Sequence, residues 1–273
     1  MNDKETLNYT YLYDVLGRPT STYGGDHSIA IQYDAKNRVV TVSNKVDGVG
    51  FKTTYTYDNT RGTIQKVSST KGSETFEKSY TLDALGRITS YLYNTGNSTV
   101  EFTYLEGGTA GTTTTLVKTM KVGNVTYGYT YDKRGNITKV TKNGSEIQSY
   151  AYDNLNQLTR ENNAETNETV VYTYDNHGNI LSKTVYPYNN TSATGETVYY
   201  GYDSNWTDLL TSYDGDTITY DQIGNPLNYR DGFSFSWSGG RKLTSVKLDN
   251  GSVYMTGEYR YDDNGIRTYK EVN

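Results

Sequence analysis

Carboxylates are numerous in this chain, and two short clusters place them close together. The 273 residues include 31 Asp and Glu, with the clusters at Asp214-Gly-Asp216 and Asp262-Asp-Asn-Gly265. A glycosidase needs two carboxyl groups that face each other across a scissile bond. Nearly every Asp here is instead explained by a turn, and the turns spread the carboxylates along the chain. We therefore expect no catalytic pair.

Metal ligation is the second chemistry that these residues could perform. The cluster that starts at Asp262 is similar to the first half of a calcium loop, but its twelfth position is Asn273 where an EF-hand has Glu. We predict no specific metal site, and incidental calcium at the turns stays an alternative.

The two histidines and the absence of cysteine narrow the enzyme classes further. His27 lies in a link and His177 at a turn, without the partners of a metal site or a nucleophilic triad, so both are expected to be exposed loop residues. There is no cysteine, no Gly-x-Ser-x-Gly elbow and no phosphate-binding Walker loop. We expect no catalytic residue and no cofactor, and thus no enzyme.

Charge and hydropathy exclude two kinds of partner. The net charge is −5, and Lys and Arg never occur in a run longer than two, so nucleic acid is not an expected partner. No stretch approaches the ~20 apolar residues of a membrane span, and residues 1–10 lack the apolar core of a signal peptide. Membrane insertion is not expected.

One motif repeats along nearly the whole chain: Tyr-x-Tyr-Asp-x-x-Gly, followed by Asn or Arg in most copies. About twelve copies occur with a mean period of roughly 22 to 23 residues. The best four copies consist of Tyr11, Tyr13, Asp14 and Gly17; Tyr129, Tyr131, Asp132 and Gly135; Tyr172, Tyr174, Asp175 and Gly178; and Tyr259, Tyr261, Asp262 and Gly265.

The spacing of the motif predicts one β-hairpin for each copy. Two Tyr at i and i+2 lie on one face of a strand. The following Asp can accept hydrogen bonds from backbone N–H groups, and the Gly can adopt the positive φ that closes a short turn. Asn37 and Asn156 stand in place of this Gly, and Asn tolerates that conformation best among the other residues.

Consecutive hairpins predict an all-β fold. About 24 strands would add side by side to one continuous antiparallel sheet, which at this width must curl into a spiral or an open barrel-like shell. Trp206 and Trp237 interrupt the motif and are interpreted as packing variants. The regular Tyr pairs favour ladder packing along the sheet, with an exposed ligand-binding row as the alternative.

These copies resemble the YD repeat, also called the Rhs repeat, of Rhs and wall-associated polymorphic toxins, of the C component of insecticidal Tc toxins and of teneurins. The resemblance covers residues 1–273 as a single array, with 1–8 as a lead-in and repeats from about 9 to 273. It implies a hollow spiral shell that encloses a C-terminal effector in the toxins and is part of an adhesive ectodomain in teneurins. The Asp-Pro-x-Gly autocleavage motif of the toxins is absent, because none of Pro19, Pro187 and Pro226 follows an Asp.

The resemblance implies a structural role within a larger protein. We expect a non-catalytic shell segment of a secreted, cell-surface or cell-wall bacterial protein, with the remaining shell and the C-terminal effector as its partners. The alternative is an adhesion or carbohydrate-binding module that uses the Tyr-lined surface to bind a carbohydrate or a surface protein. The free edges of the sheet also allow self-association.

Overall fold

The computed structural model describes residues 8–262 and 265–273 and contains 24 strands and two short 3-10 helices, with no α-helix in the described chain. The chain divides into two compact units, Met1–Ser145 and Glu146–Asn273. The all-β prediction is therefore confirmed, and the hairpins build a long antiparallel sheet.

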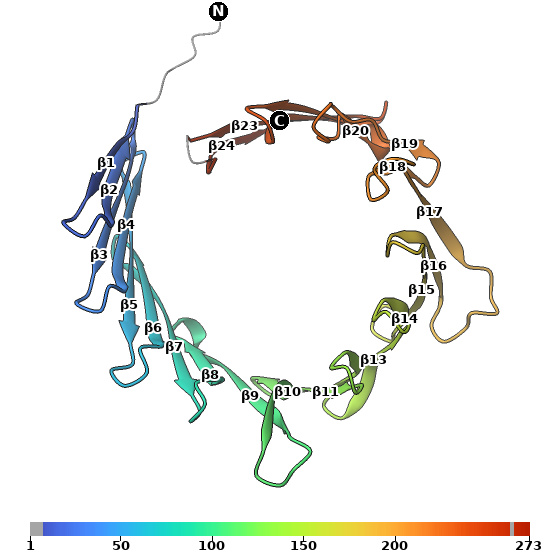
Figure 1. Cartoon of the computed structure of the whole chain (residues 1–273), viewed down its shortest axis with the longest axis horizontal. Helices are drawn as coiled ribbons and strands as arrows, with labels where there is room; N and C mark the ends of the chain where they lie inside the picture. The colour runs from blue at the N-terminus through green and yellow to red at the C-terminus, as the bar shows by residue number, and fades with distance from the viewer. Residues whose placement is uncertain (1–7, 263–264) are drawn as a thin grey trace, which may run out of the picture. The chain divides into compact units, whose positions relative to one another are not determined.

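The first unit consists of hairpins whose strands pair with the next strand along the chain (Figure 1). Its elements are β1 (Thr10–Tyr13), β2 (Pro19–Gly24), β3 (His27–Tyr33), β4 (Val39–Val46), β5 (Val49–Tyr57), β6 (Ile64–Lys71), β7 (Glu74–Leu82), β8 (Ile88–Tyr93), η1 (Thr95–Asn97), β9 (Ser98–Glu106), β10 (Thr113–Val122), β11 (Val125–Tyr131) and β12 (Ile137–Lys142).

The second unit continues the pattern and contains a separate sheet of five strands, β20 to β24. Its elements are β13 (Ser145–Tyr152), which starts at the unit boundary, β14 (Leu158–Asn163), β15 (Glu168–Tyr174), β16 (Ile180–Pro187), β17 (Glu196–Tyr202), β18 (Leu210–Tyr213), β19 (Asp216–Thr217), β20 (Asn228–Tyr229), η2 (Arg230–Gly232), β21 (Phe233–Ser238), β22 (Lys242–Asp249), β23 (Tyr254–Tyr261) and β24 (Arg267–Val272).

The prediction of one continuous sheet is wrong between β19 and β20, where strand pairing is reduced to an isolated bridge from Tyr220 to Pro226. Pro226 occupies the place where a return strand usually starts, but Pro19 holds the same place at the start of β2 and pairs with Tyr13, so the proline alone does not end the sheet. One backbone bond remains here, from the Leu227 N–H to the Thr219 carbonyl at 2.8 Å. The Asn228 side chain adds two more: its oxygen accepts the Thr219 N–H at 2.7 Å, and its nitrogen donates to the Thr217 carbonyl at 2.8 Å.

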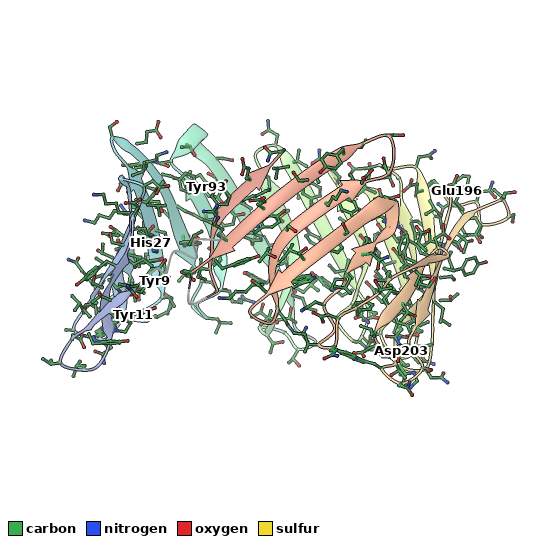
Figure 2. The ribbon with its side chains drawn as sticks, turned by 90° about the horizontal axis from the view of Figure 1, so that it is seen from above. Tyr9, Tyr11, His27, Tyr93, Glu196 and Asp203 are labelled. Carbon is green, nitrogen blue, oxygen red and sulfur yellow. The ribbon has the colours of Figure 1, made fainter. Side chains whose placement is uncertain are left out.

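The two faces of the hairpins differ in chemistry. One face, here called the Tyr face, carries the motif tyrosines, and strand register places Tyr55 opposite Val67, Tyr91 opposite Val100 and Tyr129 opposite Val140. The opposite face, here called the Thr/Ser face, carries hydroxyl pairs such as Thr103 with Thr119 at 2.6 Å. Side chains project from both faces of the strands (Figure 2).

Burial is shallow in both units. Among the described residues the buried apolar ones are few, namely Val100, Val140, Val170 and Ile218. In each unit the closest packing is between consecutive strands. In a single sheet layer, side chains on one face are buried by their neighbours on the same face. The stability of the fold therefore depends on contacts between adjacent hairpins.

Candidate functional site

Each motif turn is closed by its Asp, as the turn after β11 illustrates. The Asp132 carboxylate Oδ1 accepts the N–H groups of Arg134 at 2.8 Å and Asn136 at 2.9 Å. The Gly135 N–H donates to the Asp132 carbonyl at 3.2 Å, and Gly135 has a φ of 88°. The ladder shifts by one residue between Thr130 and Tyr131, which is the β-bulge that accompanies such a turn.

The other best copies have the same geometry. Gly17, Gly178 and Gly265 have φ values of 75°, 91° and 79°. The carboxylates of Asp14, Asp175 and Asp262 each accept the N–H of the residue four positions on, at 3.0, 2.9 and 2.7 Å. Asn37 and Asn156, which replace the Gly, have φ values of 64° and 65°. Because each strand pairs with the next along the chain, the motif turns of a unit lie at the same end of its hairpins, and we call these turns the Asp rim.

Arg after the turn Gly connects one hairpin to the next. The Arg18 Nε donates to Asp14 Oδ2 at 2.6 Å, and its guanidinium lies 4.4 Å from the centre of the Tyr33 ring on the following hairpin. Two other turns repeat this arrangement, with Arg38 over Tyr57 at 4.3 Å and Arg87 over Tyr104 at 4.1 Å. A cation over an aromatic face is attracted by the ring quadrupole.

Asn at the same position makes a neutral version of this connection. The Asn179 Nδ2 donates to Asp175 Oδ2 at 2.8 Å and to the Thr207 carbonyl of the next turn at 2.9 Å. The Asn225 Nδ2 likewise donates to Asp221 Oδ2 and to the Gly240 carbonyl, both at 2.8 Å. Arg and Asn therefore both join neighbouring turns of the Asp rim.

The second Tyr of the motif makes the most regular contact between hairpins. Its hydroxyl donates to a backbone carbonyl of the preceding hairpin's return strand, usually that strand's first residue. We call this contact the hydroxyl link. Six links span 2.7 to 3.0 Å: Tyr33 to Pro19, Tyr57 to Val39, Tyr104 to Ile88, Tyr131 to Val117, Tyr174 to Leu158 and Tyr202 to Ile180.

The hydroxyl link joins strands where their backbone pairing has already ended. The ladder between β14 and β15 ends at Arg160 and Val171, and the link from Tyr174 to Leu158 lies beyond it. Tyr220 makes an equivalent bond to Leu210, and Trp237 donates its indole N–H to the Pro226 carbonyl at 2.6 Å. The Trp237 substitution thus keeps the donor, which sequence reasoning did not anticipate.

Burial changes the ionisation of the motif tyrosines in the middle of the chain. It is the main cause that raises the pKa of Tyr129, Tyr131, Tyr172 and Tyr174, with neighbouring ionisable groups adding to the effect. These phenols therefore stay neutral hydrogen-bond donors well above physiological pH. Near the N-terminus Tyr13 is 60% exposed, whereas Tyr259 near the C-terminus is half-buried, with the Arg267 guanidinium 5.6 Å from the centre of its ring.

Hydrogen bonds stabilise the ionised form of the Asp-rim carboxylates. The Arg18 side chain lowers the pKa of Asp14, and the side chains of Asn136 and Asn179 lower the pKa of Asp132 and Asp175. A carboxylate held charged by several donors serves a turn and is a poor general acid at neutral pH.

The groups considered for catalysis do not converge in the described structure. Asp214 and Asp216 lie at the exposed hairpin between β18 and β19, and Asp262 lies in its own turn, while Asp263 and Asn264 fall outside the described residues. Across residues 8–262 and 265–273, no three His, Cys, Asp or Glu side chains gather as metal ligands would.

The histidines occupy different environments. His177 lies at a turn with its side chain 63% exposed, in agreement with the prediction. The prediction of an exposed loop was wrong for His27, which is half-buried as the first residue of β3 and has an Nδ1 without a hydrogen-bond partner. The link before it is tighter than expected, because Gly24 pairs with His27 and leaves only Gly25 and Asp26 as the turn.

An aromatic cluster in β7 to β9 was not predicted either. It consists of Phe76, Tyr80, Tyr91, Tyr93 and Phe102 around Lys78. The alternation of Phe76, Lys78 and Tyr80, and of Tyr91 and Tyr93, could have placed these residues on one face. The sequence alone does not align the three strands.

The fold and the repeated turn define a class of protein: an all-β array of hairpins joined side by side through motif tyrosines. Within this class, residues 2–222 match the family model described as Teneurin YD-shell, so the chain belongs to the YD-shell family. No helix in the described chain has the length and apolar character of a membrane span.

Two curated relatives share this sequence pattern. The chain is 27% identical over 248 residues to the tRNA nuclease WapA of Bacillus subtilis and to the tRNA3(Ser)-specific nuclease WapA of Bacillus spizizenii. Each match covers 81% of this chain and 10% of the relative, so the chain spans about a tenth of those proteins.

Similar solved structures include chains of the TcdB2-TccC3-Cdc42 and TcdB2-TccC3-TEV complexes. Both are 16% identical to this chain with a TM-score of 0.46, and each match covers 96% of this chain and 19% of the other.

Proposed function

We propose that this chain is a non-catalytic segment of a shell wall in a longer secreted or cell-surface bacterial protein, and that the complete shell encloses a C-terminal effector. In this role the repeats form one array that curls into a spiral. The remaining shell and the effector are the partners of the segment.

The observation that carries the proposal is a one-layer sheet whose Tyr face stays partly open. Phe51 and Phe76 on this face are 42% and 43% exposed. A wall segment is expected to have this property, because its faces are completed by other parts of the shell.

Membership of the YD-shell family supports the same role. The WapA relatives are named as nucleases and are about ten times longer than the matched segment, so an effector in a separate part of a longer protein agrees with that arrangement. The rim carboxylates are occupied by their turns, which supports a non-catalytic role for the segment itself.

The hydroxyl links explain how such a wall would stay closed. They join adjacent hairpins near the Asp rim, where ladder pairing has ended, so the strands are held together at the place where a curling sheet would otherwise splay. A link that depends on one side chain of each repeat also lets the array extend to any number of repeats.

Protease protection in the longer protein tests the proposal. Purified longer protein is treated with a nonspecific protease, and survival of the C-terminal segment is followed with time. We expect the segment to persist in the unmodified protein and to be digested faster when Tyr131→Phe, Tyr174→Phe and Tyr202→Phe are combined. Rapid digestion of the segment in the unmodified protein, with the repeats still folded, would refute enclosure.

A further inference from the structure

Two tyrosines of the second unit, Tyr200 on β17 and Tyr213 on β18, lie directly opposite each other on adjacent strands. Their ring centres are 5.3 Å apart, and the planes of the two rings meet at 84°. Both side chains are half-buried. In Figure 2 the labels Glu196 and Asp203 mark the first residue of β17 and the residue that follows its end, so Tyr200 lies between them.

Hydrogen bonds hold these two phenols beside each other. Burial raises the pKa of Tyr200, and Tyr213 adds to the effect through its charge and a hydrogen bond between the two side chains. The Arg230 Nη1 donates to the Tyr213 hydroxyl at 2.9 Å, and the Arg230 guanidinium lies 4.6 Å from the centre of the Tyr213 ring. The hydroxyl groups of Tyr200 and Tyr213 therefore lie side by side, and so do the ring carbons next to them.

This arrangement suits one covalent reaction, the oxidative coupling of two tyrosines. When an oxidant removes one electron and one proton from a phenol, the unpaired electron is shared between the oxygen and the ring carbons next to the C–O bond. Two such radicals in contact form a carbon–carbon bond between these ring carbons. The chain has 30 Tyr and no Cys, so an oxidative link between its strands cannot be a disulfide.

We propose that Tyr200 and Tyr213 form a modification site, at which a one-electron oxidant joins the two rings as dityrosine. The oxidant is a haem peroxidase supplied with hydrogen peroxide. Each phenol loses one hydrogen atom, the two ring carbons form their bond, and the hydrogens on these carbons move to the oxygens, which restores both phenols. The O–O bond of hydrogen peroxide breaks, and the peroxide takes up the two lost hydrogen atoms to become two molecules of water.

Other tyrosine pairs in ring contact are less suited to this coupling. Tyr80 and Tyr91 are also opposite each other, but their ring centres are 6.4 Å apart. The rings of Tyr91 and Tyr93 are 5.4 Å apart, but these residues lie on one strand. Residues two positions apart on a strand have backbones about 6.4–6.8 Å apart, whereas opposite residues on paired strands are about 4.5–5.5 Å apart. Tyr229 lies 5.9 Å from Tyr213 and belongs to the separate five-stranded sheet.

The link would fasten a weakly paired part of the sheet. The ladder between β17 and β18 has three residue pairs, and Tyr200 with Tyr213 is the pair farthest from the turn that joins the two strands. The ladder between β18 and β19 has two pairs, and the long sheet ends there. A covalent bond at this place closes the open end of the hairpin and restricts the unfolded chain, as a disulfide does.

Peptide mass spectrometry of the oxidised whole chain tests the site. Dilute purified protein is treated with a haem peroxidase and hydrogen peroxide, and the monomeric product is isolated by gel filtration. A protease that cleaves before Asp cuts at Asp203, Asp208 and Asp214. Tyr200 and Tyr213 then fall in different peptides, so a crosslink joins these peptides with the loss of two hydrogen atoms. Fragmentation of the joined peptides identifies the linked residues.

We expect joined peptides linked through Tyr200 and Tyr213 in the unmodified chain. Tyr200→Phe and Tyr213→Phe should each abolish them, because the Phe ring has no hydroxyl from which a phenoxyl radical could form. The matched control is Tyr199→Phe, which should leave the yield unchanged. Tyr199 is the sequence neighbour of Tyr200, is 64% exposed and points to the opposite face of the sheet. Circular dichroism establishes that each variant is folded, and the mapping in the unmodified chain needs no variant.

Three results would overturn the proposal. The first is a monomer without dityrosine, including the case in which dityrosine forms only between chains. The second is a crosslink located mainly at another pair, such as Tyr91 with Tyr93. The third is an equal loss of yield in Tyr199→Phe and Tyr200→Phe, because oxidation would then follow exposure and not the contact between rings. A failed protease-protection experiment leaves these outcomes unaffected, so the two proposals fail separately.

Discussion

Removing one hydroxyl link should loosen the array without disturbing its turns. In Tyr174→Phe the ring on β15 stays, and only the bond from its hydroxyl to the Leu158 carbonyl, 2.7 Å long, is lost. Leu158 begins β14, and the β14–β15 ladder ends at Arg160 and Val171, so no backbone pair of this ladder replaces the link. A single neutral hydrogen bond of this kind contributes about 0.5–1.5 kcal/mol.

The measurement is the midpoint of thermal unfolding, followed by circular dichroism. For a protein of this size about 1 kcal/mol corresponds to a shift of about 2–4 °C. The matched control is Tyr199→Phe, because Tyr199 in the adjacent hairpin is 64% exposed and makes no hydroxyl link in the described structure. We expect Tyr174→Phe to lower the midpoint and Tyr199→Phe to leave it nearly unchanged.

Two results would refute this reasoning. The first is an equal shift in both variants, which would mean that the phenol oxygen contributes no more in the link than in solvent. The second is a loss in Tyr174→Phe as large as about 3 kcal/mol or more, which would indicate a packing change rather than one lost bond.

Three further predictions concern the turns, the rim and the array. Gly135→Val should cost more than about 1 kcal/mol through its positive φ, and Gly135→Asn should cost less; the reverse order in thermal melts would contradict the turn argument. The pKa values of Asp132 and Asp175 are lowered in the folded state. The stability that these two carboxylates add to the fold is therefore complete above the unfolded-state pKa of about 3.9, and it is lost as the pH falls through the lower folded-state pKa values. The urea concentration at half-unfolding should therefore decrease as the pH is lowered from 5 to 2, and it should decrease less in Asp132→Asn. An increase over the same pH change would contradict the assignment. Amide hydrogen exchange should show the highest protection around Tyr129–Tyr174 and lower protection toward both ends, because terminal hairpins have one neighbour; uniform protection would indicate a self-contained domain.

The turns and strands could be predicted from the sequence because their causes are local. Asp132 and Gly135 lie three residues apart and determine one turn between them, and the alternation of Tyr129 with Tyr131 determines one face. The same local rule applies to every good copy, so repetition strengthened the prediction. The hairpin fold therefore follows from short stretches of sequence taken one at a time.

The contacts between hairpins could not be predicted because they depend on register. The hydroxyl of Tyr174 bonds to a residue 16 positions earlier, and nothing in the motif itself specifies that partner. The ring cluster around Lys78 depends on the alignment of β7 with β8 and β9. At the break after β19, the Asn228 side chain bonds to the backbone of Thr217 and Thr219, which the motif does not specify either.

The most direct test of the wall proposal is a cryo-electron microscopy map of the longer protein that contains these repeats. The proposal predicts that they continue into further hairpins as one curled wall, with the motif tyrosines linking neighbouring strands and with density for a C-terminal segment inside the wall. A map in which these repeats form a separate domain, with solvent on both sheet faces and the C-terminal segment outside, would contradict it.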